Sequence, residues 1–350
     1  MQTRTSEAVG LLRRLIATPS PSRDEARTGD LLHAFLAERG VRPERLHNNI
    51  WARSEGFDPA RPTLLLNSRD PYMPAIEGDR LYGLGSNDAG ASVVALTEAF
   101  LALRTRELPF NLLLALTAEE ECMGEHGIRA MLPELGRIDL AVVGEPTGMQ
   151  AAAGERGLVV LDCTAHGRSG HAARGEGINA LYIALEDIAR LRGFRFERES
   201  ALLGPIGLAV TQIEAGTQHN VVPDTCRFVV DIRTTDAYTN EETVELLRAA
   251  IRSEAVARST RIRAVALDDH HPLMRAARAA GRTAFVSPTT SDRTLMPFPA
   301  LKMGPGESSR SHAADEYIRL AEIEDGIAVY MDYIEHLAKE YGWKTLGQGI

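Results

Sequence analysis

The sequence has few of the features that mark secreted, membrane or nucleic-acid-binding proteins. Its three cysteines, Cys122, Cys163 and Cys226, are scattered and form no C-x-x-C pair, which favours a reducing cytoplasm over a disulfide framework. Aromatic residues make up only 5% and no basic run exceeds two residues, so we expect no nucleic-acid partner. No 18-residue apolar stretch and no signal-peptide pattern are present, so we expect a cytoplasmic protein without a membrane span.

The patterns that are present indicate an acidic α/β protein. The 350 residues carry a net charge of −9 and suffice for one large domain or two of ordinary size. Apolar runs at 63–66, 111–116 and 139–143 alternate with helical patterns near 91–104 and 125–133. The runs are continuously apolar, as in strands that are covered on both faces. We therefore predict an α/β fold with a central, largely parallel sheet.

A second pattern begins near residue 157. Strands at 158–165, 206–213, 226–233 and 261–267 and helices at 179–193 and 240–254 follow the order β-α-β-β-α-β. That order is the ferredoxin-like arrangement. We predict one domain made of residues 1–156 and 269–350, with an α+β domain of residues 157–268 inserted into it.

Three acidic segments each follow a predicted strand. Asp88 lies in "GLGSNDAG", Glu119, Glu120 and Glu121 in "TAEEECMGEHG", and Glu145 in "VVGEPTG". Each segment alone could be a turn or a solvated helix start. In an open α/β sheet, however, ligands gather at the carboxyl ends of the strands, and converging carboxylates repel one another unless a cation neutralises them. The three segments together predict a cation site.

Two of the ten histidines lie in loops rich in glycine that suit a functional role. His312 lies in "GPGESSRSHAADEY", and His171 lies in "HGRSGHAARGEG" within the predicted insertion. Such loops are poor core environments and frequent carriers of functional residues. Imidazole and carboxylate are ligands that suit zinc.

Seven segments in one order now resemble a known family. They are "LYGLGSNDAGASVVALTEAF", "LTAEEECMGEHG", "GEPT", "HGRSGHAA", "QHNVVPD", "DIRTTD" and "GPGESSRSHAADEY". The chain resembles the zinc aminoacylase family that includes acetylornithine deacetylase, succinyl-diaminopimelate desuccinylase and the glutamate carboxypeptidases. The resemblance implies a zinc-peptidase-like catalytic domain with an inserted lid and dimerisation domain, and a homodimer.

The implied reaction is hydrolysis of the amide of a small-molecule N-acyl amino acid. "LLLNS", "GLGSNDAG" and "AGTQHNVVPD" favour the acetylornithine deacetylase branch, with N-acetylornithine, acetylcitrulline or succinylornithine as substrate. Succinyl-diaminopimelate desuccinylase and a dipeptidase are the alternatives within the enzyme class.

The resemblance also implies a two-zinc centre, in which cobalt can substitute for zinc. Asp88 would bridge the two ions. Glu121 and His312 would complete one ion's ligands, and Glu145 with a histidine from a strand tip would complete the other's. An open position on zinc would hold the attacking water.

The remaining roles concern catalysis and substrate binding. Glu120 would be the general base, paired with the glutamate that follows it, although a one-residue shift to Glu119–Glu120 stays open. His171 would reach the partner subunit's active site and stabilise the oxyanion. Asn220 and Arg233 would bind the substrate's carboxylate.

One expected motif is absent. In the family, a His-x-Asp ends the strand that here reads "LLLNS", but Ser68 is followed directly by Arg69 and by "DPYMPAIEGDRLYGLG", which matches a later stretch. We predict that the polypeptide carries a further loop of about a dozen residues between Ser68 and Arg69. We expect that this loop is disordered and is for that reason absent from the sequence above. The alternative is a true deletion in a non-catalytic paralogue that binds N-acyl amino acids and about one metal ion.

Overall fold

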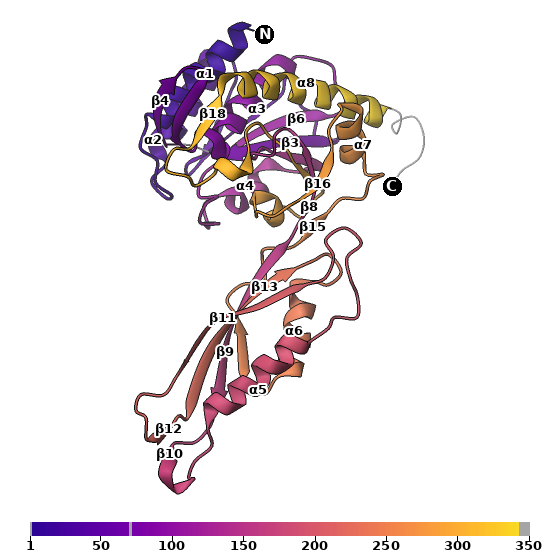
Figure 1. Ribbon diagram of the computed structural model, residues 1–350. Helices are drawn as coiled ribbons and strands as arrows, with labels where there is room; N and C mark the ends of the chain where they lie inside the picture. Colours follow the sequence, from indigo (N-terminus) through magenta and orange to yellow (C-terminus); the bar gives the residue numbers. More distant parts are fainter. Residues whose placement is uncertain (1, 70–71, 343–350) are drawn as a thin grey trace. The chain divides into compact units, whose positions relative to one another are not determined.

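The computed structural model describes residues 2–69 and 72–342 (Figure 1). The chain forms two compact units. One unit comprises Met1–Ala153, Leu267–Phe285 and Ser291–Ile350, and the other comprises Gly154–Ala266 with Val286–Thr290. The predicted boundaries, after residues 156 and 268, lie within three residues of these, whereas the contribution of 286–290 to the second unit was not foreseen.

The first unit contains a mixed sheet with the strand order β1-β2-β6-β3-β7-β17-β8. Its central strands are parallel, whereas β1, β2 and β8 pair antiparallel. The predicted parallel sheet is therefore correct for the centre only. The strands are β1 (Glu44–Leu46), β2 (Asn49–Arg53), β3 (Thr63–Arg69), β6 (Asn111–Thr117), β7 (Leu140–Val143), β8 (Ala151–Glu155) and β17 (Ala300–Lys302); β15 (Val265–Ala266) and β16 (Ala284–Ser287) also pair with β8.

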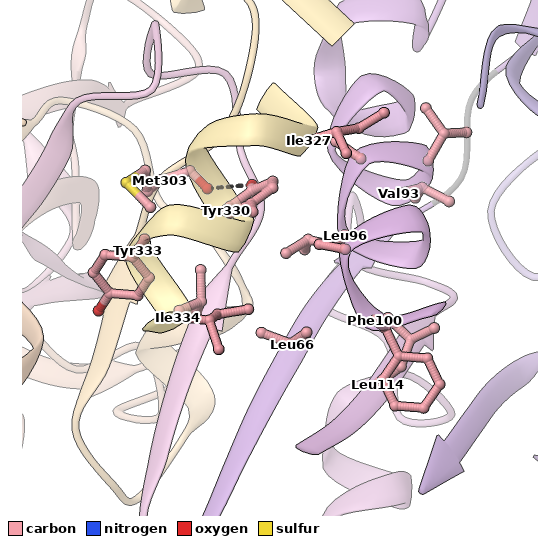
Figure 2. Packing of buried hydrophobic residues seen from close by; sticks show 14 of the residues in the cluster. Leu66, Val93, Leu96, Phe100, Leu114, Met303, Ile327, Tyr330, Tyr333 and Ile334 are labelled. Carbon is pink, nitrogen blue, oxygen red and sulfur yellow. Dashed lines mark hydrogen bonds between the residues drawn. The ribbon is translucent and has the colours of Figure 1, made fainter. Parts of the chain in front are cut away.

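Apolar side chains cover both faces of this sheet, which explains the unbroken apolar runs. Leu64, Leu66 and Leu114 belong to one buried cluster, and Leu65 and Leu113 belong to another, as the two-residue period of a strand requires. Figure 2 shows Leu66 and Leu114 beside residues of α3 and α8. The helices are α1 (Gln2–Ile16), α2 (Ala26–Glu38), α3 (Ala91–Leu103), α4 (Ile128–Leu135), α7 (Pro272–Ala279) and α8 (Leu320–Gly342).

Strand β3 runs without a break through the position of the predicted loop. Ser68 pairs with Leu116 and Arg69 with Thr117, in continuous register with β6, and β4 (Tyr72–Glu77) begins three residues after β3 ends. The prediction of a missing segment between Ser68 and Arg69 is therefore wrong. Asp70, the first residue of the stretch "DPYMPAIEGDRLYGLG", lies outside the described residues.

A small sheet brings two distant loops together. Its order is β18-β5-β4, with β5 at Arg80–Leu84 and β18 at Tyr317–Arg319. Tyr317 pairs with Tyr82, so the loop that precedes β18 and the turn that follows β5 start from neighbouring strands. The turn contains Asp88, and the loop contains His312.

The second unit has the predicted ferredoxin-like order. Its antiparallel sheet runs β11-β13-β9-β14, formed by β9 (Gly157–His166), β11 (Gly207–Ala215), β13 (Thr225–Thr234) and β14 (Glu254–Ala257), with helices α5 (Ala180–Gly193) and α6 (Asn240–Ala250). The predicted fourth strand, 261–267, is wrong. Helix α6 ends at Ala250 rather than at 254, and the short segment after it completes the sheet, while Val265–Ala266 pairs with β8.

None of the described helices is long and apolar enough to cross a membrane.

Candidate active site

Three loops that carry predicted site residues leave the same edge of the main sheet. Strands β6 and β7 lie on either side of β3 and run parallel to it, and β17 pairs in parallel with β7. Glu120 and Glu121 follow β6, Glu145 follows β7, and His312 lies in the loop after β17. Because carboxyl ends of parallel strands meet at one edge, these side chains gather there.

His312 lies between two carboxylates from different loops. Its Nε2 is 3.5 Å from Asp88 Oδ2 and 3.5 Å from Glu121 Oε1. Ligands about 2.0–2.1 Å from a tetrahedral zinc are about 3.3 Å apart, so both distances suit ligands that share one ion. As they stand, however, the residues described by the structure include no group of three or more His, Cys, Asp or Glu side chains arranged to hold a metal.

The side chain of Glu119 forms a hydrogen bond within the loop after β6 and so stabilises that loop. Glu119 has a φ of 54°, and its Oε2 accepts a hydrogen bond from the backbone N–H of His126 at 3.3 Å. A Cβ on Gly124 would lie 1.8 Å from that same oxygen, so only glycine fits there. Because Glu119 is used in this way, the arrangement favours Glu120 and Glu121, rather than Glu119 and Glu120, as the pair that supplies the general base and the metal ligand.

Two residues that hold this loop were missed from the sequence. Glu25 Oε1 accepts the N–H of Glu119 at 3.0 Å, and Asn49 Oδ1 accepts the N–H of Ala118 at 2.9 Å. Asn49 also donates to the carbonyl of His126. These partners lie 69 to 94 residues away from the backbone groups that they bind, so no local pattern marks them.

Glu145 lies two residues after the end of β7, beside the carboxyl end of β3. It is 6% exposed, and the preceding Gly144 donates its N–H to the carbonyl of Asn67 at 2.7 Å. A Cβ on Gly304, in the loop after β17, would lie 2.5 Å from the carbonyl oxygen of Glu145. The backbones after three neighbouring strands therefore approach closely around this residue.

The end of β3 has a different character. Ser68 is 2% exposed, and its hydroxyl donates to the carbonyl of Gly144 at 3.0 Å. The side-chain amide of Asn67 donates to Thr117 Oγ1 at 3.1 Å. Neither an imidazole nor a carboxylate stands in the described part of β3 where the family resemblance expects the histidine.

A second buried carboxyl lies under the Asp88 turn. Glu316 is 2% exposed, and burial raises its pKa, against the opposing effect of backbone N–H groups at Asp88 and Asn87. The sequence did not single out this residue, although it lies in the same segment as His312.

His171 and Asn220 lie next to each other in the second unit. His171 ends β10 (Gly170–His171) and pairs with Val221 of β12 (Val221–Val222). The N–H of Ala172 donates to the carbonyl of Asn220 at 3.1 Å. His171 is exposed, and its Nδ1 accepts the N–H of Ala173 at 3.2 Å.

Arg233 does not join them within one chain. It lies near the end of β13, where its guanidinium pairs with Asp231 at 2.8 Å, while Asn220 precedes the start of that strand. The eight residue steps from Thr225 to Arg233 span roughly 27 Å at about 3.4 Å per step. Asn220 and Arg233 of a single chain therefore cannot bind the same carboxylate.

Comparison with known proteins gives one family and a consistent set of relatives. Residues 60–336 match the model for peptidase family M20/M25/M40. The chain is 32% identical to succinyl-diaminopimelate desuccinylase of Paracoccus denitrificans over 52% of this chain and 50% of that protein. It is 27% identical to the enzyme of the same name from Halorhodospira halophila over 95% of this chain and 98% of that protein.

Solved structures show the same fold at low sequence identity. The aminopeptidase PepT of Bacillus cereus superposes with a TM-score of 0.79 at 19% identity, covering 95% of this chain and 99% of that chain. A Bacillus subtilis protein, YXEP, described as a dinuclear metal-binding peptidase, superposes with a TM-score of 0.73 at 15% identity, covering 97% and 99%. The chain belongs to peptidase family M20/M25/M40 and is a hydrolase that acts on amide bonds.

Proposed function

We propose that the chain is a metal-dependent hydrolase that removes the acyl group from an N-acyl amino acid. The observation that carries the proposal is the position of His312, 3.5 Å from the carboxylates of both Asp88 and Glu121. The curated relatives named succinyl-diaminopimelate desuccinylase make an N-succinyl diamino acid the first substrate class to test. N-acetylornithine and its analogues are the second.

The donor set favours one strong metal position. Asp88, Glu121 and His312 offer two carboxylates and an imidazole, a set that suits zinc or cobalt. For a second ion the described residues offer the carboxylates of Glu145 and Asp88, with no histidine from β3. We therefore propose one tightly held ion per chain and a second that binds more weakly. A bound ion of this kind polarises the amide carbonyl and lowers the pKa of a water.

The chain's own residues then handle the proton. Glu120, at 8% exposure, takes the proton from the attacking water and returns it to the leaving amine, the work of a general base that becomes a general acid. The hydrogen bonds that fix the loop at Ala118 and Glu119 hold Glu120 in place.

A homodimer would complete the site. Because Asn220 and Arg233 lie at opposite ends of β13, they can serve one substrate only if they come from different subunits. Strand β11 is an edge strand of the described sheet of the second unit. Apolar side chains are exposed on it, at Val210 and Ile213, and on α5, at Tyr182 and Leu185. Helix α5 packs on β11, so we propose this edge and α5 as the surface that pairs with a second copy.

A substrate panel tests the proposed function. Metal-free protein would be reloaded with zinc or cobalt and assayed with N-succinyl-diaminopimelate, N-acetylornithine, N-acetylcitrulline, N-succinylornithine and a dipeptide. We expect turnover of at least one N-acyl amino acid, with Glu120→Gln as the inactive control. No turnover of any member with metal bound would overturn the proposal and favour a protein that binds these compounds without cleaving them.

A further inference from the structure

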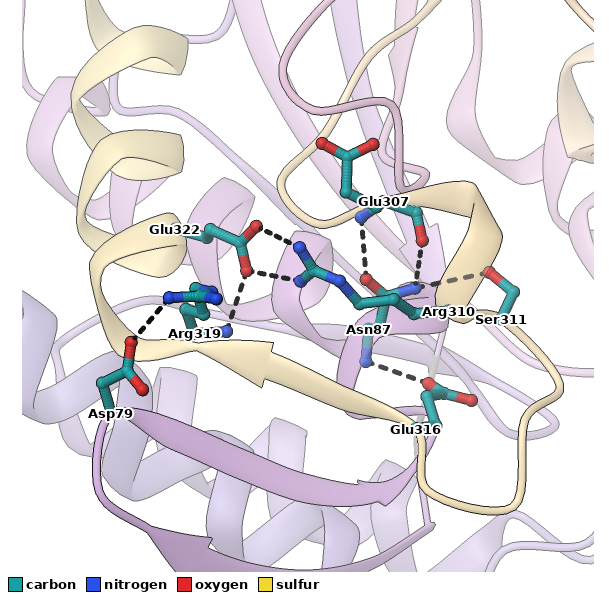
Figure 3. Close-up of polar contacts among 8 residues, drawn as sticks. All are labelled: Asp79, Asn87, Glu307, Arg310, Ser311, Glu316, Arg319 and Glu322. Atoms are coloured by element: carbon teal, nitrogen blue, oxygen red, sulfur yellow. Dashed lines mark hydrogen bonds and ion pairs between the residues drawn. The ribbon is translucent and has the colours of Figure 1, made fainter.

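Asn87, next to Asp88, fastens the Asp88 turn to the segment that precedes His312. Its Oδ1 accepts the N–H of Glu307 at 2.9 Å, and its Nδ2 donates to the carbonyl of Glu307 at 3.0 Å. The same Nδ2 lies 3.3 Å from Ser311 Oγ. Figure 3 shows the amide of Asn87 enclosed by this loop.

Glu316 fastens the same turn to the segment that follows His312. Its Oε1 accepts the backbone N–H groups of Asn87 and Asp88, each at 2.9 Å. The direction of bonding is now reversed, because the His312 loop supplies the side chain and the Asp88 turn supplies the backbone. We call Asn87 and Glu316 the reciprocal clamp.

The reciprocal clamp is tightly packed. Asn87 is fully buried and Glu316 is 2% exposed. Gly306 has a φ of +85°, and a Cβ on it would lie 2.2 Å from Asn87 Oδ1. The loop therefore approaches the Asn87 amide more closely than any other residue type at position 306 would permit.

A separate set of contacts anchors the same loop to α8. Arg310 makes a bidentate ion pair with Glu322 at 2.7 and 2.9 Å, and the N–H of Arg319 donates to Glu322 at 2.8 Å. Arg319 also pairs with Asp79 at 3.2 Å. Figure 3 shows these contacts beside the reciprocal clamp. Because these bonds join Glu322 to the loop and to β18 rather than to the Asp88 turn, Glu322 is a matched control.

We propose that Asn87 and Glu316 are positioning residues that hold Asp88 and His312 at the separation of two ligands of one ion, and that they thereby set the metal affinity. The inference rests on the proposed metal-dependent function. A ligand pair held in place by its neighbours binds an ion without first losing the entropy of two free loops, and hydrogen bonds around ligands commonly control metal affinity.

Metal titration of three variants tests the proposal. The dissociation constant for zinc would be measured by chelator competition in wild type, Glu316→Ala, Glu316→Asp and Glu316→Gln. We expect Glu316→Ala to weaken binding by about 10- to 100-fold, the usual range for such partners. Glu316→Asp, which withdraws the carboxylate by one methylene, should also weaken it. Glu316→Gln keeps an amide oxygen as acceptor and should restore most of the affinity.

The control separates positioning from general stabilisation. Glu322→Gln should lower the melting temperature while leaving the zinc dissociation constant unchanged. Hydrogen exchange of metal-free protein gives a second readout: Glu316→Ala and Glu316→Asp should speed exchange at residues 86–90, whereas Glu322→Gln should not. Unchanged zinc affinity in folded Glu316→Ala or Glu316→Asp would overturn the positioning role.

The two proposals fail in different ways. If wild type binds no metal through Asp88 and His312, the proposed function fails, and faster exchange at 86–90 in the variants would show a tie that only stabilises the loops. If wild type binds metal and hydrolyses substrate while the Glu316 variants bind it equally well, the proposed function stands and the reciprocal clamp has no part in it.

Discussion

Two neighbouring strand ends in this molecule differ sharply in chemistry. Strands β3 and β6 are parallel, adjacent and in continuous register, with Ser68 opposite Leu116, and each contains an apolar run, at 64–66 in β3 and at 112–116 in β6. After β6 come Glu120 and Glu121, and Glu121 Oε1 lies 3.5 Å from His312 Nε2. At the end of β3, the side chains of Asn67 and Ser68 donate hydrogen bonds to Thr117 and Gly144, respectively. A strand's place in the sheet therefore does not make its end part of the site; the side chains and their partners do.

The largest expected effect comes from removing the imidazole that lies beside Glu121, the carboxylate after β6. His312→Ala deletes the imidazole that lies 3.5 Å from both carboxylates. We expect loss of tightly bound metal and a fall of activity to background, measured by elemental analysis and steady-state assay. If His312→Ala retained both the metal and the activity, the catalytic metal would have to bind elsewhere at this edge of the sheet.

Glu120→Gln should have the next largest effect, on chemistry alone. Removing a general base commonly costs about 10²–10⁴-fold in rate, while Glu121 and His312 would remain to bind the ion. We expect kcat to fall by that range with unchanged zinc affinity, measured by kinetics and chelator competition on one preparation. A weaker effect on kcat than on zinc affinity would make Glu120 a ligand instead.

Mixed dimers test whether the second unit contributes to a partner's site. A His171→Ala chain and a Glu120→Gln chain, each inactive alone, should regain part of the wild-type activity when they share a dimer. The activity would be measured on hetero-dimers purified with two affinity tags. Proven hetero-dimers without activity would show that each site is completed within one chain.

Ser68→Ala should affect stability without affecting catalysis. The lost hydrogen bond to the carbonyl of Gly144 should lower the free energy of unfolding by about 1 kcal/mol, measured by urea denaturation. Zinc affinity and kcat/KM should stay at wild-type values. A marked loss of zinc affinity in Ser68→Ala would give the end of β3 a role in the metal centre.

The smallest effect concerns thiol reactivity. Cys122, in the loop after β6, is exposed, whereas Cys163 and Cys226 are buried, and burial raises the pKa of Cys163 to about 12. A raised pKa keeps the thiol protonated and unreactive at pH 8. We expect a thiol reagent to label one cysteine per native chain and three after unfolding, by mass spectrometry. Labelling of Cys163 in native protein would contradict the packing of the second unit.

The sequence predicted most features that depend on local pattern. The acids after β6 and β7, the His312 loop and the ferredoxin-like order can all be read from short segments. The hydrogen bonds that hold these segments in place could not be predicted from the sequence. Glu316 and Asn87, for example, are 229 residues apart, and nothing in either segment identifies its partner. The predicted loop after Ser68 failed for another reason: it relied on an expected motif spacing, whereas pairing with β6 is satisfied by the residues that are present.

The stoichiometry of tightly held metal is the most direct test of the proposed metal centre. Protein purified with excess zinc would be passed through a weak chelating resin and analysed by elemental analysis and native mass spectrometry. The difference between the ends of β6 and β3 predicts one zinc ion per chain after this step, with a second ion detectable only at excess zinc. Two ions per chain that resist the resin equally would contradict the account, because they would require a second full set of ligands.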